Sequence, residues 1–158
     1  MIAGQSSSFH WRENPAAQAR TIDEAVAIAR DGGVDIPEDV SFWVDELGEL
    51  GPDRTACGPR VDKPDEAIVY WADLVHDRTG KVPFRVWEGI LKSDEAIVAV
   101  LGHEMYELQR LRPLLKSGKT TIGEFIAMTC PGNPGNLHDQ AWEFADRLVE
   151  QMRKGGRE

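Results

Sequence analysis

Basic residues are scarce in this sequence. Its 158 residues include 18 lysines and arginines against 27 aspartates and glutamates, which gives a formal net charge of -9 and an isoelectric point near 4.9. Proteins that bind nucleic acid or anionic lipid normally present a basic face, so this balance argues against both ligands. A divalent-metal nuclease would suit the acidic residues, but the sequence lacks a basic groove for phosphate.

Long apolar runs are absent as well. The first residues, MIAGQSSSFHWREN, lack the apolar core of a secretory signal, and nowhere do about 18 apolar residues follow one another. We therefore expect a soluble, cytoplasmic protein without a transmembrane segment. Delivery by a route that needs no signal peptide stays open.

Cysteine is limited to two positions, Cys57 and Cys130, without a C-x-x-C pair. This spacing suggests neither a thiolate zinc knuckle nor a disulfide framework. Free thiols in a reducing compartment are expected, with a single Cys57–Cys130 bridge as the alternative.

The length suits one domain with its own core. We expect a flexible N-terminal segment over 1–20, a single domain over 21–153 and a disordered tail over 154–158. The predicted elements run from a helix through strands to further helices. This order favours the α+β class, with a small antiparallel or mixed β-sheet packed against about four helices.

Capping signals and apolar periodicity place these elements. The N-terminal half is expected to contain a helix with a capping box from Thr21 to Glu24 and a stop at Gly32, a strand in 39–47, a short strand through Cys57, and a β-hairpin of 66–76 and 81–91. The C-terminal half is expected to contain a helix that Ser93 caps and that ends near Arg112 before Pro113, a helix with a capping box from Thr121 to Glu124, and a last helix that Asn136 opens.

One predicted helix contains the segment AIVAVLGHEMYEL, 96–108, in which a histidine and two glutamates interrupt an apolar run. Residues four apart on a helix lie about 40° apart, so His103 and Glu107 could hold one ion between them. Glu104 projects about 100° to the side. Two ligands one turn apart, with a glutamate between them as general base, are typical of a hydrolytic zinc site.

The neighbours of these three residues on the helix are apolar: Ala96, Ile97, Val100, Leu101, Leu108 and Leu111. An unpaired carboxylate in such surroundings is costly, so a metal ion or a cationic side chain must be near. The alternative to a metal site is a set of solvated charges, or a buried glutamate paired to an arginine such as Arg110 or Arg112.

A third ligand is expected from the last helix. His138 shares its face with apolar residues: Ala141, Trp142, Ala145 and Val149. It should point inward, whereas Asp139 lies on a charged stripe and serves the helix dipole. His103, Glu107 and His138 would then supply two imidazoles and a carboxylate, the ligand set of His₂Glu zinc sites, with a fourth position for water. An ordinary packed imidazole is the alternative for His138, and His76 is the next candidate ligand.

The segments SDEAIVAVLGHEMYELQRLRPLL (93–115) and GNLHDQAWEFADRLVEQM (135–152) resemble minimal zincin-like metallopeptidase domains. The chain looks like the small domains at the C-terminal ends of bacterial Rhs-type and other polymorphic toxins, over about residues 62–152. The resemblance implies that His103 is a ligand and Glu104 the general base, while Glu107 stands where the family has a histidine. It also implies a polypeptide substrate or partner, bound along an edge strand in 81–89 with Arg85 and Glu88 at the rim.

The sequence therefore predicts a metal-dependent hydrolase, a peptidase with one zinc ion, in which Glu104 activates a metal-bound water. The metal ligands are expected to be His103, Glu107 and His138. The alternative is a non-catalytic interaction domain, toxin-associated or immunity-like, in which these side chains form a buried polar network or a structural metal site.

Overall fold

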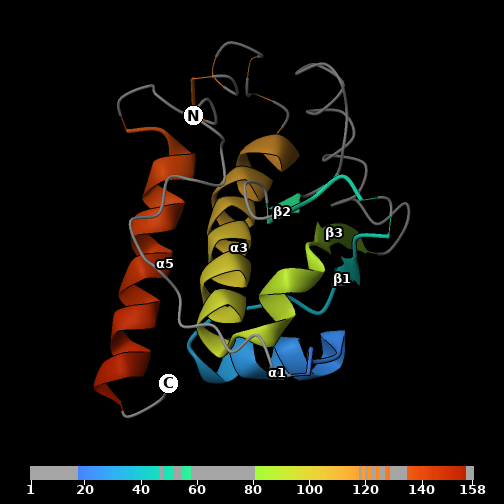
Figure 1. Cartoon of the computed structure of the whole chain (residues 1–158). Helices are drawn as coiled ribbons and strands as arrows, with labels where there is room; N and C mark the ends of the chain where they lie inside the picture. Colours follow the sequence, from blue (N-terminus) through green and yellow to red (C-terminus); the bar gives the residue numbers. More distant parts are fainter. Residues whose placement is uncertain are drawn as a thin grey trace.

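The computed structural model describes residues 18–46, 48–51, 55–57, 81–117, 119, 121, 124, 127–128 and 135–155. The elements within these ranges are α1 (Ile22–Asp31), β1 (Val40–Val44), β2 (Ala56–Cys57), β3 (Val82–Val86), the 3-10 helix η2 (Glu88–Lys92), α3 (Asp94–Ser117) and α5 (Leu137–Lys154) (Figure 1). The predicted α+β class is confirmed. About four helices were expected, and three α-helices have defined bounds in the described part of the chain.

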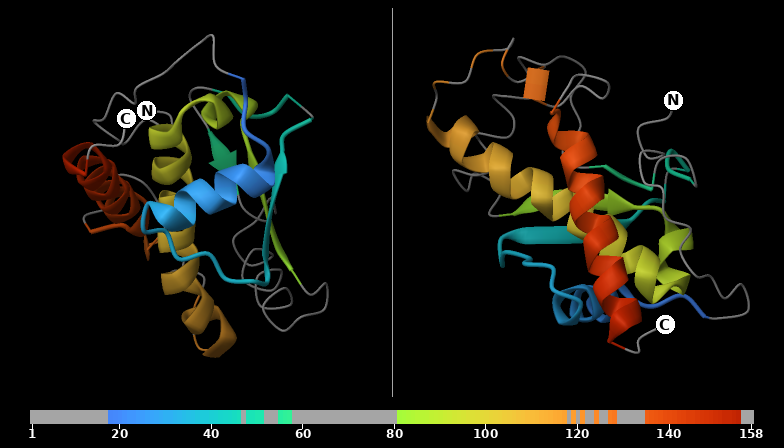
Figure 2. Two further views of the ribbon diagram at one scale, coloured as in Figure 1. Left: turned by 90° about the horizontal axis from the view of Figure 1, so that it is seen from below. Right: turned by 90° about the vertical axis from the view of Figure 1, so that its left-hand side faces the viewer.

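The long helix α3 lies between α5 and the sheet, and α1 crosses near its N-terminal end (Figures 1 and 2). Helices α3 and α5 are antiparallel: Glu95 of α3 bonds to Arg153 near the end of α5, while Leu111 of α3 packs with Leu137 at its start. The main core collects apolar side chains from α1, all three strands, α3 and α5. This sandwiched position explains why α3 is apolar around most of its circumference.

The sheet has the strand order β1-β3-β2. Strand β1 pairs with β3 in parallel, from Val40 opposite Val82 to Val44 opposite Val86. Strand β2 pairs with β3 in antiparallel orientation, with Ala56 opposite Val86. The sheet is therefore mixed, and the fully antiparallel alternative is wrong.

The expectation of a peptide-binding edge strand in 81–89 is also wrong. Strand β3 is the central strand, so both of its sides carry backbone partners. The two predicted rim residues have other places. Arg85 forms ion pairs with Asp45 and Glu49, at 2.9 and 2.8 Å, and Glu88 begins η2 and so lies outside the strand. Parallel pairing of β1 with β3 joins segments far apart in the chain, which local alternation does not reveal.

The predicted hairpin of 66–76 and 81–91 is tested only in its second half, because 66–76 lies outside the described residues. Its second strand is shorter than expected and gives way to η2. At Gly89 a side-chain Cβ would lie 2.3 Å from the Trp87 indole ring, so the ring occupies the space that a side chain at 89 would need.

The predicted N-terminal elements are confirmed. Thr21 and Glu24 form a reciprocal capping box at the start of α1, and Gly32 caps its end. In β1 the side chain of Phe42 is buried while that of Trp43 is exposed, as the alternation indicated. The predicted segment 1–20 and the tail 154–158 lie largely outside the described residues, and so does Cys130.

The predicted end of the metal-ligand helix is wrong. Ser93 caps α3 by accepting a hydrogen bond from the Ala96 N–H at 3.1 Å, as expected, but α3 continues through Pro113 to Ser117. Proline inside a helix removes one backbone hydrogen bond, at a cost of about 3 kcal/mol. Leu111, which packs against Leu137, is the last buried residue before Pro113, and the described residues after it, Pro113, Leu114 and Ser117, are exposed.

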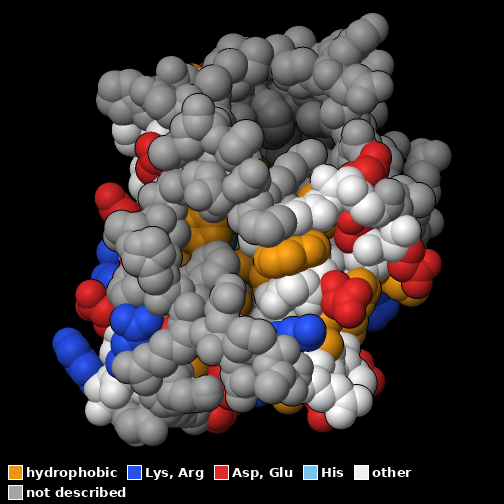
Figure 3. Space-filling view, viewed as in Figure 1, with side chains coloured by type: hydrophobic (Ala, Val, Ile, Leu, Met, Phe, Trp, Pro, Cys, Tyr) orange, Lys and Arg blue, Asp and Glu red, His pale blue; other side chains and the backbone are white. Residues whose placement is uncertain are grey.

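The capping contacts predicted for the last two helices are confirmed. The Thr121 hydroxyl and the Glu124 carboxylate accept hydrogen bonds from each other's backbone N–H groups, at 3.1 and 3.0 Å. Asn136 caps α5 by accepting from the Asp139 N–H at 2.8 Å. On the face seen in Figure 3, the acidic and basic side chains of the described residues are interspersed. None of the described helices is long and apolar enough to cross a membrane.

Candidate metal centre

The antiparallel contact of α3 and α5 brings the three predicted ligands together. His103 and Glu107 lie one turn apart on α3, and His138 lies in the first turn of α5. Next to His103, a Cβ on Gly102 would lie 3.1 Å from the end of the Leu148 side chain of α5. A larger residue at 102 would therefore require that side chain to shift by a few tenths of an ångström.

His103, Glu107 and His138 form one ligand group. One ligand atom from each residue lies within 4.8 Å of the other two. His103 Nε2 lies 3.3 Å from one Glu107 carboxylate oxygen, and His138 Nδ1 lies 3.6 Å from the other. The two imidazoles meet edge to face with their centroids 4.7 Å apart. This buried group could hold a metal ion.

The electrostatics of the group keep its carboxylate ionised. Burial alone would raise the pKa of Glu107, but the adjacent His103 and His138 imidazoles outweigh burial and lower that pKa to about 2. The Glu107 side chain is 20% exposed and that of His103 is 3% exposed. Glu107 is therefore the side of the group nearest to solvent.

Glu104, the predicted general base, lies next to this group. Its Oε2 is 3.5 Å from His103 Nε2, the atom that also faces Glu107, and its side chain is 11% exposed. Glu104 projects to one side of His103 and Glu107, but it still lies beside the ligand group. A carboxylate in this place can exchange a proton with a molecule held at the centre.

Trp142 is a feature of the centre that the sequence did not assign. Its ring lies against the His103 imidazole with the centroids 4.2 Å apart and the planes inclined by 36°. His103 Nδ1 is buried and has no hydrogen-bond partner among the described residues. A metal-binding histidine usually has its second nitrogen held by a hydrogen bond. Here the indole ring holds the imidazole instead.

The signal for Trp142 was present in the sequence, since it lies four residues after His138 on the inward face of α5. The other members of that face, Ala141, Ala145 and Val149, are buried as predicted. His138 is 9% exposed and so points inward. Asp139 is exposed and hydrogen-bonds to Asn136 at the helix start, so its predicted exclusion from the group is confirmed.

The predicted alternative of an arginine partner for the buried glutamate is wrong for both candidates. Arg112 forms an ion pair with Asp39. The Arg110 guanidinium lies over the Tyr106 ring, with Cζ 3.4 Å from its centroid. His76, the alternative third ligand, and His10 lie outside the described residues.

The donor set fits a divalent metal ion. It combines two imidazole nitrogens with one carboxylate, and the three ligand atoms converge between α3 and α5. Comparisons with protein-family models, with curated proteins and with solved structures found no match to this chain.

Proposed function

We propose that this chain is a zinc-dependent peptidase with a zincin-like core. The observation that carries the proposal is the buried group of His103, Glu107 and His138 with Glu104 beside it. A metal-ligand helix that also carries the general base is the functional unit of zincins, with one ligand type exchanged here. The resemblance to toxin domains supports a polypeptide as substrate.

Zinc is the proposed ion because of the ligand types. Two histidines and one glutamate match the His₂Glu class of catalytic zinc sites, in which three protein ligands leave a fourth position open. Calcium and magnesium prefer sites built mainly from oxygen ligands. A site with two imidazoles therefore favours zinc over either of these ions.

The residues of the chain have distinct roles in this proposal. His103, Glu107 and His138 would bind the ion, which would supply Lewis acidity toward the substrate carbonyl and toward water. The Glu104 carboxylate would take a proton from the attacking water and pass it to the leaving amine. Trp142 would hold the His103 ring in its binding orientation.

A second candidate function is favoured by the contacts within the group. Glu107 faces both imidazoles, with carboxylate–nitrogen distances of 3.3 and 3.6 Å, so the three side chains already lie together as a polar network without an ion. In a non-catalytic interaction domain, these three side chains would have a structural role only.

Zinc content and a single substitution test the proposed function. The chain, purified without a chelator or histidine tag, should contain about one zinc ion, as expected for one His₂Glu site per chain. Glu104→Gln should retain that zinc and lose turnover on a peptide library, because glutamine preserves volume but is not a base. Absence of zinc from the wild-type chain would favour the interaction domain, and loss of zinc in Glu104→Gln would make Glu104 a ligand.

A further inference from the structure

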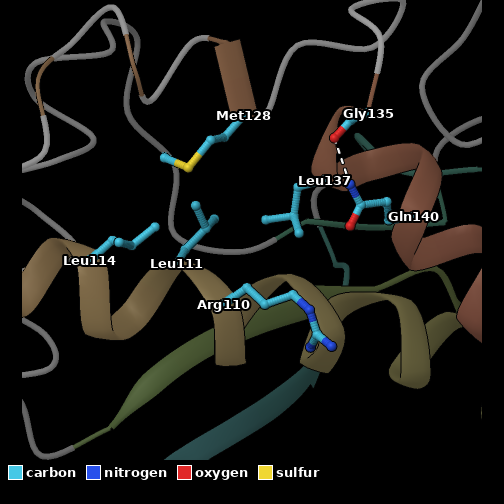
Figure 4. A pocket seen from close by; sticks show the side chains of 7 residues that line it. All are labelled: Arg110, Leu111, Leu114, Met128, Gly135, Leu137 and Gln140. Carbon is cyan, nitrogen blue, oxygen red and sulfur yellow. Dashed lines mark hydrogen bonds between the residues drawn. The ribbon is translucent and has the colours of Figure 1, made fainter.

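A pocket of about 220 Å³ lies next to the ligand group, between the C-terminal half of α3 and the start of α5 (Figure 4). Two of its lining residues adjoin metal ligands: Leu111 lies one helical turn after Glu107, and Leu137 directly precedes His138. One turn of helix advances about 5.4 Å along the axis. The pocket and the ligand group are therefore neighbours along both helices.

The floor of the pocket is apolar and the rim is polar. Leu111 and Leu114 of α3, Leu137 of α5, and Met128 converge on one space, while Gln140 lies to the right in Figure 4 and Arg110 lies below. A cavity of about 150 Å³ in another protein accommodates benzene. The pocket is therefore large enough for one leucine, methionine or phenylalanine side chain.

The rim carries a preorganised cation. The Arg110 guanidinium lies flat over the Tyr106 ring, 3.4 Å from its centroid, and its one hydrogen bond among the described residues, to the Tyr106 carbonyl, is long at 3.5 Å. Within those residues no carboxylate forms an ion pair with Arg110. Stacking leaves the in-plane N–H groups of a guanidinium free to bind a carboxylate.

Hydrogen bonds hold this rim in place. The Tyr106 hydroxyl donates to Gln140 Oε1 at 3.4 Å, and the Gln140 amide donates to the Gly135 carbonyl at 2.5 Å. The ring under Arg110 is thus tied to the first turns of α5. Few rotamers need to be fixed when a ligand binds, which favours affinity.

We infer that this pocket binds the C-terminal residue of a peptide, with its apolar side chain on the leucine floor and its carboxylate on Arg110. The inference rests on the proposed function, because it makes the last peptide bond the one presented to Glu104. Water would add to the carbonyl carbon of that bond and the C–N bond would break. The proton would pass through Glu104 to the amine, releasing a free apolar amino acid and the shortened peptide.

Peptide binding tests the inference without relying on turnover. The probe is a fluorescent peptide that ends in leucine, with either a free or an amidated C-terminus, bound to zinc-loaded Glu104→Gln protein. Amidation should weaken binding about tenfold, the value of one charge-assisted contact. Adding Arg110→Gln should weaken binding of the free acid by the same factor and leave that of the amide unchanged.

Two further variants control for charge and for pocket shape. Arg147→Gln removes an exposed arginine of α5 outside the pocket and should change nothing. Because Leu114 is 40% exposed, the Leu114→Trp protein should still fold. The larger side chain should fill the pocket and weaken binding of a peptide acid that ends in leucine more than binding of one that ends in alanine.

The outcomes separate this inference from the function on which it rests. Cleavage of internal bonds by wild type, with equal affinity for acid and amide, would overturn the inference and leave the peptidase proposal standing. If the chain binds no zinc but still needs Arg110 to bind the free-acid peptide, the assignment of the pocket stands and the peptidase proposal is rejected. An Arg110→Gln protein that still distinguishes acid from amide would also overturn the inference.

Discussion

Two carboxylates of α3, the buried Glu95 and the partly buried Glu107, form contacts with α5, and the partners of the two differ in kind. Glu95 is 1% exposed and receives two hydrogen bonds from the Arg153 guanidinium, at 3.0 and 2.8 Å. Glu107 instead faces the imidazoles of His103 and His138, at 3.3 and 3.6 Å. One helix pair thus contains a carboxylate–guanidinium pair and a carboxylate–imidazole group.

The difference between these two groups indicates which of them can bind a metal. A guanidinium remains protonated and offers no lone pair, so the Glu95–Arg153 pair has no place for a cation. A neutral imidazole has a nitrogen lone pair and can share a metal ion with the carboxylate that it faces. Burial of a carboxylate does not by itself indicate a metal site. The site is indicated by the chemistry of the partner, an imidazole instead of a guanidinium.

The largest expected effect on zinc binding comes from neutralising Glu107. Loss of a group outside the ligand shell typically weakens metal binding by about 10–100-fold, so removal of an anionic ligand by Glu107→Gln should weaken zinc binding by more than about 100-fold. Glu95→Gln is the matched control and should bind zinc as wild type does. Zinc titration by calorimetry measures both, and equal losses would remove the distinction between the two groups.

The histidine of α5 should show nearly as large an effect. His138→Ala removes one of three ligands and should also weaken zinc binding by more than about 100-fold. Asp139→Ala changes the adjacent, exposed residue and should leave zinc affinity unaltered. If Asp139→Ala lost zinc while His138→Ala kept it, the ligand from α5 would be the aspartate.

A smaller effect is expected at Trp142, which contacts a ligand without being one. Trp142→Leu should weaken zinc binding about tenfold, because the His103 ring loses the surface that orients it. Trp142→Phe keeps an aromatic face and should recover most of that loss. The absorption spectrum of the cobalt-substituted protein provides a readout that stability does not: it should change in Trp142→Leu and stay close to wild type in Trp142→Phe. The same spectrum in all three proteins would restrict Trp142 to core packing.

The smallest effect on zinc is expected from breaking the carboxylate–guanidinium pair. Arg153→Met should leave zinc affinity within about twofold of wild type, since distant sites act independently. It should nevertheless lower the free energy of unfolding of the metal-free chain more than Glu107→Gln does, because it removes the two hydrogen bonds that the guanidinium donates to the buried Glu95 carboxylate. Urea denaturation of the two variants makes the comparison, and a reversed order would mean that Glu107 carries the larger structural role.

The sequence predicted the ligand group because helical periodicity is local information. The four-residue spacing of His103 and Glu107, and the apolar face around His138, determined which side chains point inward. The sequence did not reveal the contact between His103 and Trp142, since it depends on how closely α3 and α5 approach. The central place of β3 depends on parallel pairing with β1, a contact between distant segments. Pro113 misled the prediction, because α3 continues through this local helix breaker to Ser117.

Anomalous diffraction at the zinc edge, from crystals grown with zinc, tests the metal centre most directly. We expect one peak between α3 and α5, about 2.0–2.1 Å from His103 Nε2 and His138 Nδ1 and at bonding distance from Glu107. Crystals of Glu107→Gln should lack that peak. A wild-type crystal without density at this place, or with zinc bound only by other residues, would contradict the assignment.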